Sequence, residues 1–161
     1  MRYLMRQKLL SLTDSFIIRN EAGDDVFTVR LKLLSIGKQL TFEDMEGNEV
    51  AFIRQKLISL RSTYEIYRGG KHFATVSKDL FTLFRHKFQI DVPGPDDLEA
   101  AGNFLDREYA FERAGRTVAQ VSRRWFTITD TYGVDIEDGE DDALILASSV
   151  AIDMIAHGEN D

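Results

Sequence analysis

The segment that most constrains this fold lies near the C-terminus, where residues 143–156 are apolar around nearly the whole circumference of a helix. Only Ser148, Ser149 and Asp153 interrupt this apolar run. A helix that is apolar on every side either spans a membrane or is buried inside protein. These residues would rise only about 21 Å, which is short of the roughly 30 Å hydrocarbon core of a bilayer. We therefore expect a helix over about 141–157 that the rest of the chain encloses; a membrane anchor and a surface or oligomer helix are the alternatives.

From Tyr3 to Ile136 the hydrophobic pattern has a period of two, as in strands with one buried face. Residues 27–33 show it clearly, because apolar residues alternate there with Thr28, Arg30 and Lys32. Similar runs are Phe16–Arg19, Val50–Lys56, Thr63–Tyr67, Phe73–Lys78, Tyr109–Arg113, Thr117–Ser122 and Trp125–Thr129. The pattern predicts an all-β body that precedes the helix.

Four of the predicted hairpins begin with the same pattern, a glycine followed by two polar residues and an apolar one, at Gly23, Gly47, Gly70 and Gly115. Each glycine can adopt the positive φ that a tight turn between strands requires. Four residues later stand Phe27, Ala51, Ala74 and Ala119, on the same strand face as Val29, Ile53, Val76 and Val121. Three alanines at equivalent inward positions leave space inside a closed antiparallel barrel, and the C-terminal helix would fill it.

Charge is divided unequally along the 161 residues. Residues 1–90 contain 15 Lys and Arg against 10 Asp and Glu, a net of +5, whereas residues 91–161 contain 5 against 17, a net of −12. The overall charge of −7 argues against a general nucleic-acid binder. The absence of cysteine excludes disulfides, thiol nucleophiles and cysteine-containing zinc sites.

The candidate binding residues are two pairs of cations in the basic half. Arg30 and Lys32 form one i, i+2 pair, and Arg54 and Lys56 form another on a repeat-equivalent strand. On outward faces of neighbouring strands, the four side chains could reach one phosphorylated head group. The alternative is an ordinary surface, since outward Lys and Arg protect sheets against edge pairing.

Catalytic and metal-binding patterns are absent from the sequence. There is no Gly-x-Ser-x-Gly elbow, and His72, His86 and His157 stand in unrelated contexts. The acidic run over 135–142 fails as an EF-hand loop, because Val134 would occupy its first ligand position. We expect no enzyme, no cofactor and no metal site, with weak divalent-cation binding by this loop left open and negative charge there favouring the helix N-terminus.

One stretch carries a family resemblance: Gly102-Asn103-Phe104-Leu105-Asp106-Arg107-Glu108-Tyr109-Ala110-Phe111, supported by residues 130–136 and the tail 141–157. It resembles the LURP-one-related proteins, a single-domain branch of the tubby-like fold. The resemblance implies one domain over 1–161, with about twelve strands closed around the C-terminal helix. Relatives of this group include phosphoinositide-binding tubby domains and phospholipid scramblases, but their binding residues match no motif here.

Together these patterns predict a non-enzymatic binding module for anionic phospholipid or phosphoinositide head groups. The alternative is a protein-interaction or scaffold domain with no small ligand. The N-terminal residues 1–8 are broken by charge and offer no signal-peptide core. We expect a monomeric cytoplasmic protein that either stays free or binds peripherally at the membrane.

Overall fold

The computed structural model describes residues 1–6, 15–34, 37–57, 62–79, 87–126 and 131–158. In these ranges the chain forms twelve strands followed by one helix. The elements are β1 (Arg2–Arg6), β2 (Ser15–Asn20), β3 (Asp25–Leu34), β4 (Gly37–Asp44), β5 (Glu49–Lys56), β6 (Thr63–Arg68), β7 (Lys71–Asp79), β8 (Lys87–Asp91), β9 (Leu98–Asn103), β10 (Glu108–Arg113), β11 (Arg116–Ser122), β12 (Thr131–Ile136) and α1 (Asp142–Gly158).

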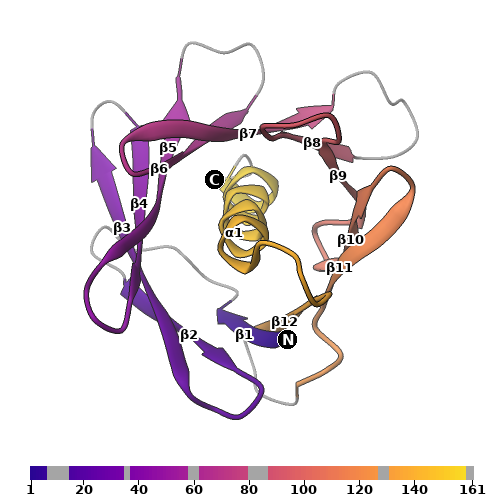
Figure 1. The fold of residues 1–161 in the computed structure, drawn as a ribbon, viewed down its shortest axis with the longest axis horizontal. Helices are drawn as coiled ribbons and strands as arrows, with labels where there is room; N and C mark the ends of the chain where they lie inside the picture. The colour runs from indigo at the N-terminus through magenta and orange to yellow at the C-terminus, as the bar shows by residue number, and fades with distance from the viewer. Residues whose placement is uncertain (7–14, 35–36, 58–61, 80–86, 127–130, 159–161) are drawn as a thin grey trace.

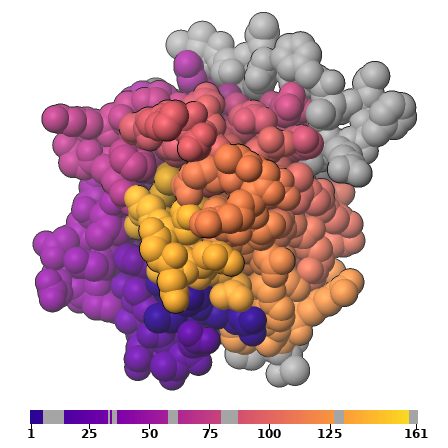
Figure 2. All heavy atoms as spheres, turned by 45° about the vertical axis from the view of Figure 1, so that its right-hand side comes forward, coloured from indigo at the N-terminus to yellow at the C-terminus, as the bar shows by residue number. Residues whose placement is uncertain are grey.

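The strands form a closed antiparallel barrel with α1 inside it (Figure 1). Each strand pairs with the next along the chain, and β1 pairs with β12 to close the ring. At this closure the Met1 amino group donates to the Ile136 carbonyl at 2.8 Å, and the Ile136 N–H donates back to Met1 at 2.9 Å. In the space-filling view, gold atoms from late in the chain lie between its indigo start and the orange strands (Figure 2). The predicted barrel is confirmed.

The predicted inward positions are also confirmed. Val29, Ile53, Val76 and Val121 are at most 2% exposed, and the three alanines of the repeat, Ala51, Ala74 and Ala119, are at most 1% exposed. The four repeat glycines all have positive φ, between 75° and 88°. The small side chains of Ala51 and Ala74 belong to β5 and β7, two of the strands that α1 contacts. Alanine at these positions therefore lets the helix pack close to the barrel wall.

The helix is enclosed as its apolar circumference predicts. Apart from its ends it is buried throughout, and Ala147, Ser148, Ser149, Val150 and Ala151 have no exposed surface. Ser149 Oγ satisfies its donor by bonding the Ile145 carbonyl one turn earlier at 2.9 Å. No helix among the described residues is long and apolar enough to cross a membrane.

One strand prediction is wrong at its first two residues. The sequence pattern predicts a strand over Trp125–Thr129, but Trp125 and Phe126 form no strand, and residues 127–129 lie outside the described ranges. The rings of Trp125 and Phe126 instead cover Gly133 of β12, where a Cβ would come within 2.7 Å of both rings. The sequence around Trp125 and Phe126 resembles a strand because it is aromatic and β-branched. In the structure the two rings pack over Gly133 on the outside of the barrel instead.

The antiparallel order places successive turns at opposite ends of the barrel. The helix-entry end, where α1 begins, carries the turns at 21–24, 45–48, 69–70, 92–97, 114–115 and 137–141. The helix-exit end, where α1 finishes, carries the last residues of β3 and β5 and the turn at 104–107. Along β3–β5 the described residues near these two ends differ in charge.

Candidate functional site

The acidic residues before the helix are held by cations of the barrel. Arg68 on β6 binds Asp141 through two hydrogen bonds of 2.6 Å, and Arg113 on β10 binds Glu140 at 2.6 and 2.8 Å. The Tyr3 hydroxyl donates to Asp142. These carboxylates therefore fasten the helix start to the barrel wall. The described residues contain no group of three or more His, Asp or Glu side chains that could hold a metal ion.

Asp141 is also the N-cap of the helix, since its Oδ1 accepts the Leu144 N–H at 3.1 Å. Burial alone would raise the pKa of Asp141, but hydrogen bonds from Arg68 and Leu144 outweigh it and lower the pKa below its ordinary value. The carboxylate therefore stays ionised at neutral pH. The predicted preference of the helix start for negative charge is confirmed, with barrel arginines as the partners.

At the helix-exit end a buried ion pair fastens the other end of α1. Arg107 Nε donates to Asp153 Oδ1 at 2.7 Å, and the two side chains are only 8% and 6% exposed. Arg107 reaches inward from the turn between β9 and β10, where its φ is +52°. Gly102 in β9 allows this turn to close, because a Cβ there would lie 2.7 Å from the Glu108 carbonyl oxygen. The family-like stretch 102–111 thus anchors the helix.

Buried tyrosines surround this pair. The Arg107 guanidinium lies 5.5 Å from the centre of the Tyr132 ring, and His157 Nε2 lies 3.6 Å from Asp153. Burial, and secondarily the charge of Asp153, raises the pKa of both Tyr109 and Tyr132. Burial also raises the pKa of the Asp153 carboxyl, while the charge and hydrogen bond of Arg107 favour its ionised form. Arg107, Asp153 and the two tyrosines are at least nine-tenths buried, so these side chains hold the helix and offer no surface to a ligand.

The sequence interpretation missed this pair. An aspartate inside an otherwise apolar buried helix requires a cationic partner, since an unpaired buried charge costs several kcal/mol. The presence of Asp153 in the apolar segment therefore indicated that a cationic side chain elsewhere in the chain pairs with it. Its identity depended on the turn that brings Arg107 to it across 46 positions of the chain.

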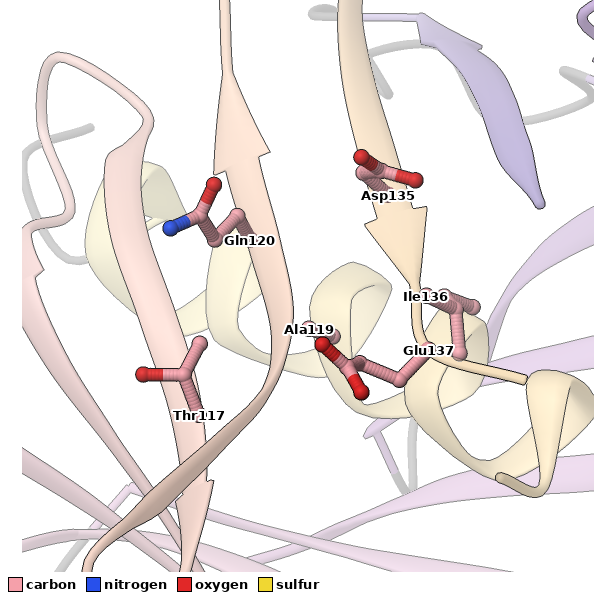
Figure 3. Close-up of a pocket in the computed structure, with 6 residues that line it drawn as sticks. All are labelled: Thr117, Ala119, Gln120, Asp135, Ile136 and Glu137. Carbon is pink, nitrogen blue, oxygen red and sulfur yellow. The ribbon is translucent and has the colours of Figure 1, made fainter. Parts of the chain in front are cut away.

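A small hollow of about 280 Å³ lies between the first half of β11 and the end of β12 (Figure 3). It is lined by Thr117, Ala119, Gln120, Asp135, Ile136 and Glu137. Gln120 and Asp135 face each other as a cross-strand pair, and Asp135 is bound by Arg2 at 3.3 Å. The carboxylates of Asp135 and Glu137 would make the hollow repel an anionic ligand. Two carboxylates are also fewer than the three acidic or histidine side chains sought above for a metal site.

The four predicted binding residues, Arg30, Lys32, Arg54 and Lys56, are all exposed on the outer face of the barrel. Their strands are not direct neighbours, because β4 lies between β3 and β5. Lys32 stands opposite Gln39, which in turn stands opposite Arg54. At about 4.8 Å per strand, the backbones of Lys32 and Arg54 are roughly 10 Å apart.

Carboxylates from neighbouring strands engage the two arginines but not the two lysines. Arg30 pairs with Glu43 at 3.2 Å, and Arg54 pairs with Glu65 at 3.2 Å. Arg54 also donates to the Tyr67 hydroxyl at 2.7 Å. Lys32 and Lys56 make no ion pair with any described residue. The lysines are therefore the cations that can meet a ligand without first losing a partner.

Charge separates along these three strands. Toward the helix-exit end, residues 31–34, 37–40 and 53–57 contain four cations and no carboxylate: Lys32, Lys38, Arg54 and Lys56, which we call the basic rim. Toward the helix-entry end the same strands and their turn carry Asp25, Glu43, Asp44, Glu46 and Glu49. Arg30 lies in this second, acidic region, where it pairs with Glu43. The chain reversal between β3 and β4 also brings Lys38 to this end, where it stands opposite Leu33. Lys38 alternates with the outward positions of β4 and shares the face of buried Leu40 and Phe42, so it lies on the inward face and not beside the other three cations.

Comparisons with known proteins agree with this architecture. A family model described as LURP-one-related matches residues 1–153. The uncharacterized protein YxjI of Bacillus subtilis (strain 168) is 30% identical over 157 residues, which cover 98% of this chain and 94% of that protein. An X-ray structure of a protein from Arabidopsis thaliana has a TM-score of 0.65 at 16% identity, covering 94% of this chain and 88% of that one. At such low identity the likeness shows the fold alone.

Proposed function

The chain belongs to the LURP-one-related family, and on that basis, together with the charge pattern of its outer face, we propose that it is a non-catalytic binding domain for the head groups of anionic phospholipids or phosphoinositides. The basic rim would receive the phosphate groups. The observation that carries this proposal is the concentration of cations in the last residues of β3 and β5 and the first of β4, stretches with no carboxylate of their own. Of these cations Lys32, Arg54 and Lys56 are exposed, and Arg54 is paired with Glu65 of β6.

Electrostatics supports an anionic surface as the ligand. Each Lys or Arg held near such a surface contributes about 1 kcal/mol of attraction, which salt weakens. Lysine is a compact, mobile point charge, so Lys32 and Lys56 can adapt to phosphates whose positions vary from lipid to lipid. Binding by the rim should therefore depend strongly on salt and on the charge of the lipid.

The test is sedimentation with vesicles that contain phosphatidylserine or a phosphoinositide, compared with neutral phosphatidylcholine vesicles. Lys32→Ala/Lys56→Ala is the informative variant, because it removes two cations that pair with no carboxylate of the described residues, whereas Arg54→Ala would also remove the arginine that binds Glu65. We expect about thirtyfold weaker binding at low salt, from two charges of about 1 kcal/mol each.

The matched control is Lys71→Ala/Arg116→Ala, which removes two exposed cations next to turns at the helix-entry end. This control should bind as wild type does. Equal losses in the two double variants would mean that only net charge matters and would contradict the rim as a site. Absence of wild-type binding to anionic vesicles at low salt would contradict the proposed function and favour a protein partner.

A further inference from the structure

On the outer face of the barrel, one carboxylate lies between an arginine of the basic rim and a histidine. Glu65 of β6 accepts a hydrogen bond from Arg54 of β5 through Oε1 at 3.2 Å, and its Oε2 lies 3.7 Å from Nε2 of His72 on β7. The three strands are direct neighbours in the ring (Figure 1). Glu65 alternates with the buried Tyr64 and Ile66, so its side chain belongs to the outer face. We call Arg54, Glu65 and His72 the Glu65 trio.

Neighbouring side chains hold the two basic members of the trio in place. Arg54 donates to the Tyr67 hydroxyl at 2.7 Å, and its guanidinium lies 5.1 Å from the centre of the Tyr67 ring. The His72 ring meets the same tyrosine edge-on at 5.6 Å, and its Nε2 lies 2.8 Å from Thr75 Oγ1. The side chains of Arg54 and His72 are 46% and 48% exposed, whereas Glu65 is 18% exposed. Both basic side chains therefore reach solvent, and the carboxylate is the most buried member of the trio.

Glu65 takes the place at Arg54 that a ligand phosphate would take, because carboxylate and phosphate oxygens accept the same charge-assisted hydrogen bonds from a guanidinium. While His72 is neutral, the charges of Arg54 and Glu65 cancel. Histidine is the side chain whose charge ordinarily changes between about pH 5 and 8. A protonated imidazole would pair with Glu65 and bring the trio from neutral to one net positive charge.

Other charged groups stand near His72 on the strands around it. Lys71 precedes it on β7, and Asp91 ends β8, the next strand of the ring. Burial, and secondarily the charge of Asp97, raises the pKa of Asp91, so this carboxylate also loses charge on acidification. Of the carboxylates described on these strands, Glu65 is the one that the structure brings into ion-pair contact with His72.

We propose that Glu65 competes with lipid phosphate for Arg54, and that protonation of His72 relieves this competition, so that the protein binds anionic lipid more tightly at acidic pH. This inference rests on the proposed function and adds regulation to the same site. At neutral pH the lysines Lys32 and Lys56 bind without Arg54. At acidic pH the charge of Arg54 adds to theirs.

The test is sedimentation at low salt with phosphatidylglycerol vesicles, whose phosphodiester keeps its single charge across the pH range used. Between about pH 7.5 and about pH 5.5, wild type should gain about fivefold in affinity from the one added charge. His72→Gln keeps a hydrogen-bonding group beside Thr75 but cannot take up a proton, so it should lose this gain. Asp91, His86 and His157 are present in both proteins, so the difference between the two reports His72.

Glu65→Gln tests the competition directly. It removes the competing charge and should bind about fivefold more tightly than wild type at about pH 7.5. Glu43→Gln is the matched control, because Glu43 pairs with Arg30 at the same distance of 3.2 Å but in the acidic region and with no histidine in ion-pair contact among the described residues. This control should bind as wild type does at both pH values.

Equal gains in the two glutamine variants would mean that only net charge matters, and would overturn the inference. An undiminished pH response in His72→Gln would also overturn it, while binding that depends on Lys32 and Lys56 would leave the proposed function intact. Absence of wild-type binding at both pH values would contradict the proposed function, and the inference with it.

Discussion

At the scale of single residues, the least expected interaction is the buried pair of Arg107 and Asp153. A buried ion pair gains little net stability over apolar packing, because both charges lose their hydration. Its effect lies in specificity, since Asp153 has a single well-placed cation within 2.7 Å. The pair ties the last turns of α1 to the turn between β9 and β10.

Arg107→Ala should destabilise the protein by about 3–5 kcal/mol, because it removes the guanidinium that is hydrogen-bonded to the buried Asp153 carboxylate. Urea unfolding measures this loss. Arg107→Met/Asp153→Leu, which removes both charges, should recover part of the stability. The control is Arg19→Ala, which breaks an ion pair of 2.8 Å whose side chains are 51% and 43% exposed, and which should cost at most about 1 kcal/mol. Equal losses for the two arginine variants would contradict a buried pair.

At the scale of elements, the helix start shows how local preference and tertiary contact cooperate. An acidic residue favours a helix N-terminus in any context, through the cap and the dipole. Here Asp141 and Glu140 also bind Arg68 of β6 and Arg113 of β10, which lie four strands apart in the ring. The helix start is thereby held to strands on two sides of the barrel.

Asp141→Asn should lower stability at neutral pH by about 1 kcal/mol, because it keeps a cap oxygen but loses the charge that faces Arg68. The pKa of Asp141 is lowered in the folded state, so its contribution is present above the unfolded value of about 4 and is lost as pH falls through the folded value. The difference between variant and wild type should therefore shrink below about pH 4.

Urea unfolding at neutral and acidic pH measures this difference. Asp138→Asn, at an exposed position of the same turn, is the control and should match wild type at both pH values. A difference for Asp141→Asn that stays constant with pH would mean that its carboxylate contributes nothing through ionisation.

At the scale of the whole molecule, the barrel and the helix depend on each other. Twelve strands enclose more space than their own inward side chains fill, and three of the repeat positions that face inward are alanines. The helix supplies the missing apolar volume, and the barrel shields a segment that is apolar on every side. We therefore expect the two to fold and unfold as one cooperative unit.

Ala147→Asp should abolish this cooperative unit, because residue 147 is fully buried and an unpaired charge there costs several kcal/mol. Circular dichroism and thermal unfolding check the outcome. Ala22→Asp places the same charge in an exposed turn and should unfold as wild type does. A sharp transition for Ala147→Asp at the wild-type temperature would show that the helix can leave the barrel without loss of the fold.

The sequence alone predicted the all-β body, the repeat turns, the inward alanines and the enclosed helix, because period, glycine φ and apolar circumference are properties of neighbouring residues. It did not predict every strand, since the pattern named no separate run for β4, β8, β9 or β12 and placed a strand at Trp125 and Phe126, where none forms. It also identified the cations of β3 and β5 as candidates, and their role stays a prediction. Only the tertiary structure decided that Arg30 and Arg54 face carboxylates, that Lys38 lies on the inward face of β4, and that Arg107 meets Asp153. Such pairings join residues far apart in the chain, and barrel closure alone sets their distances.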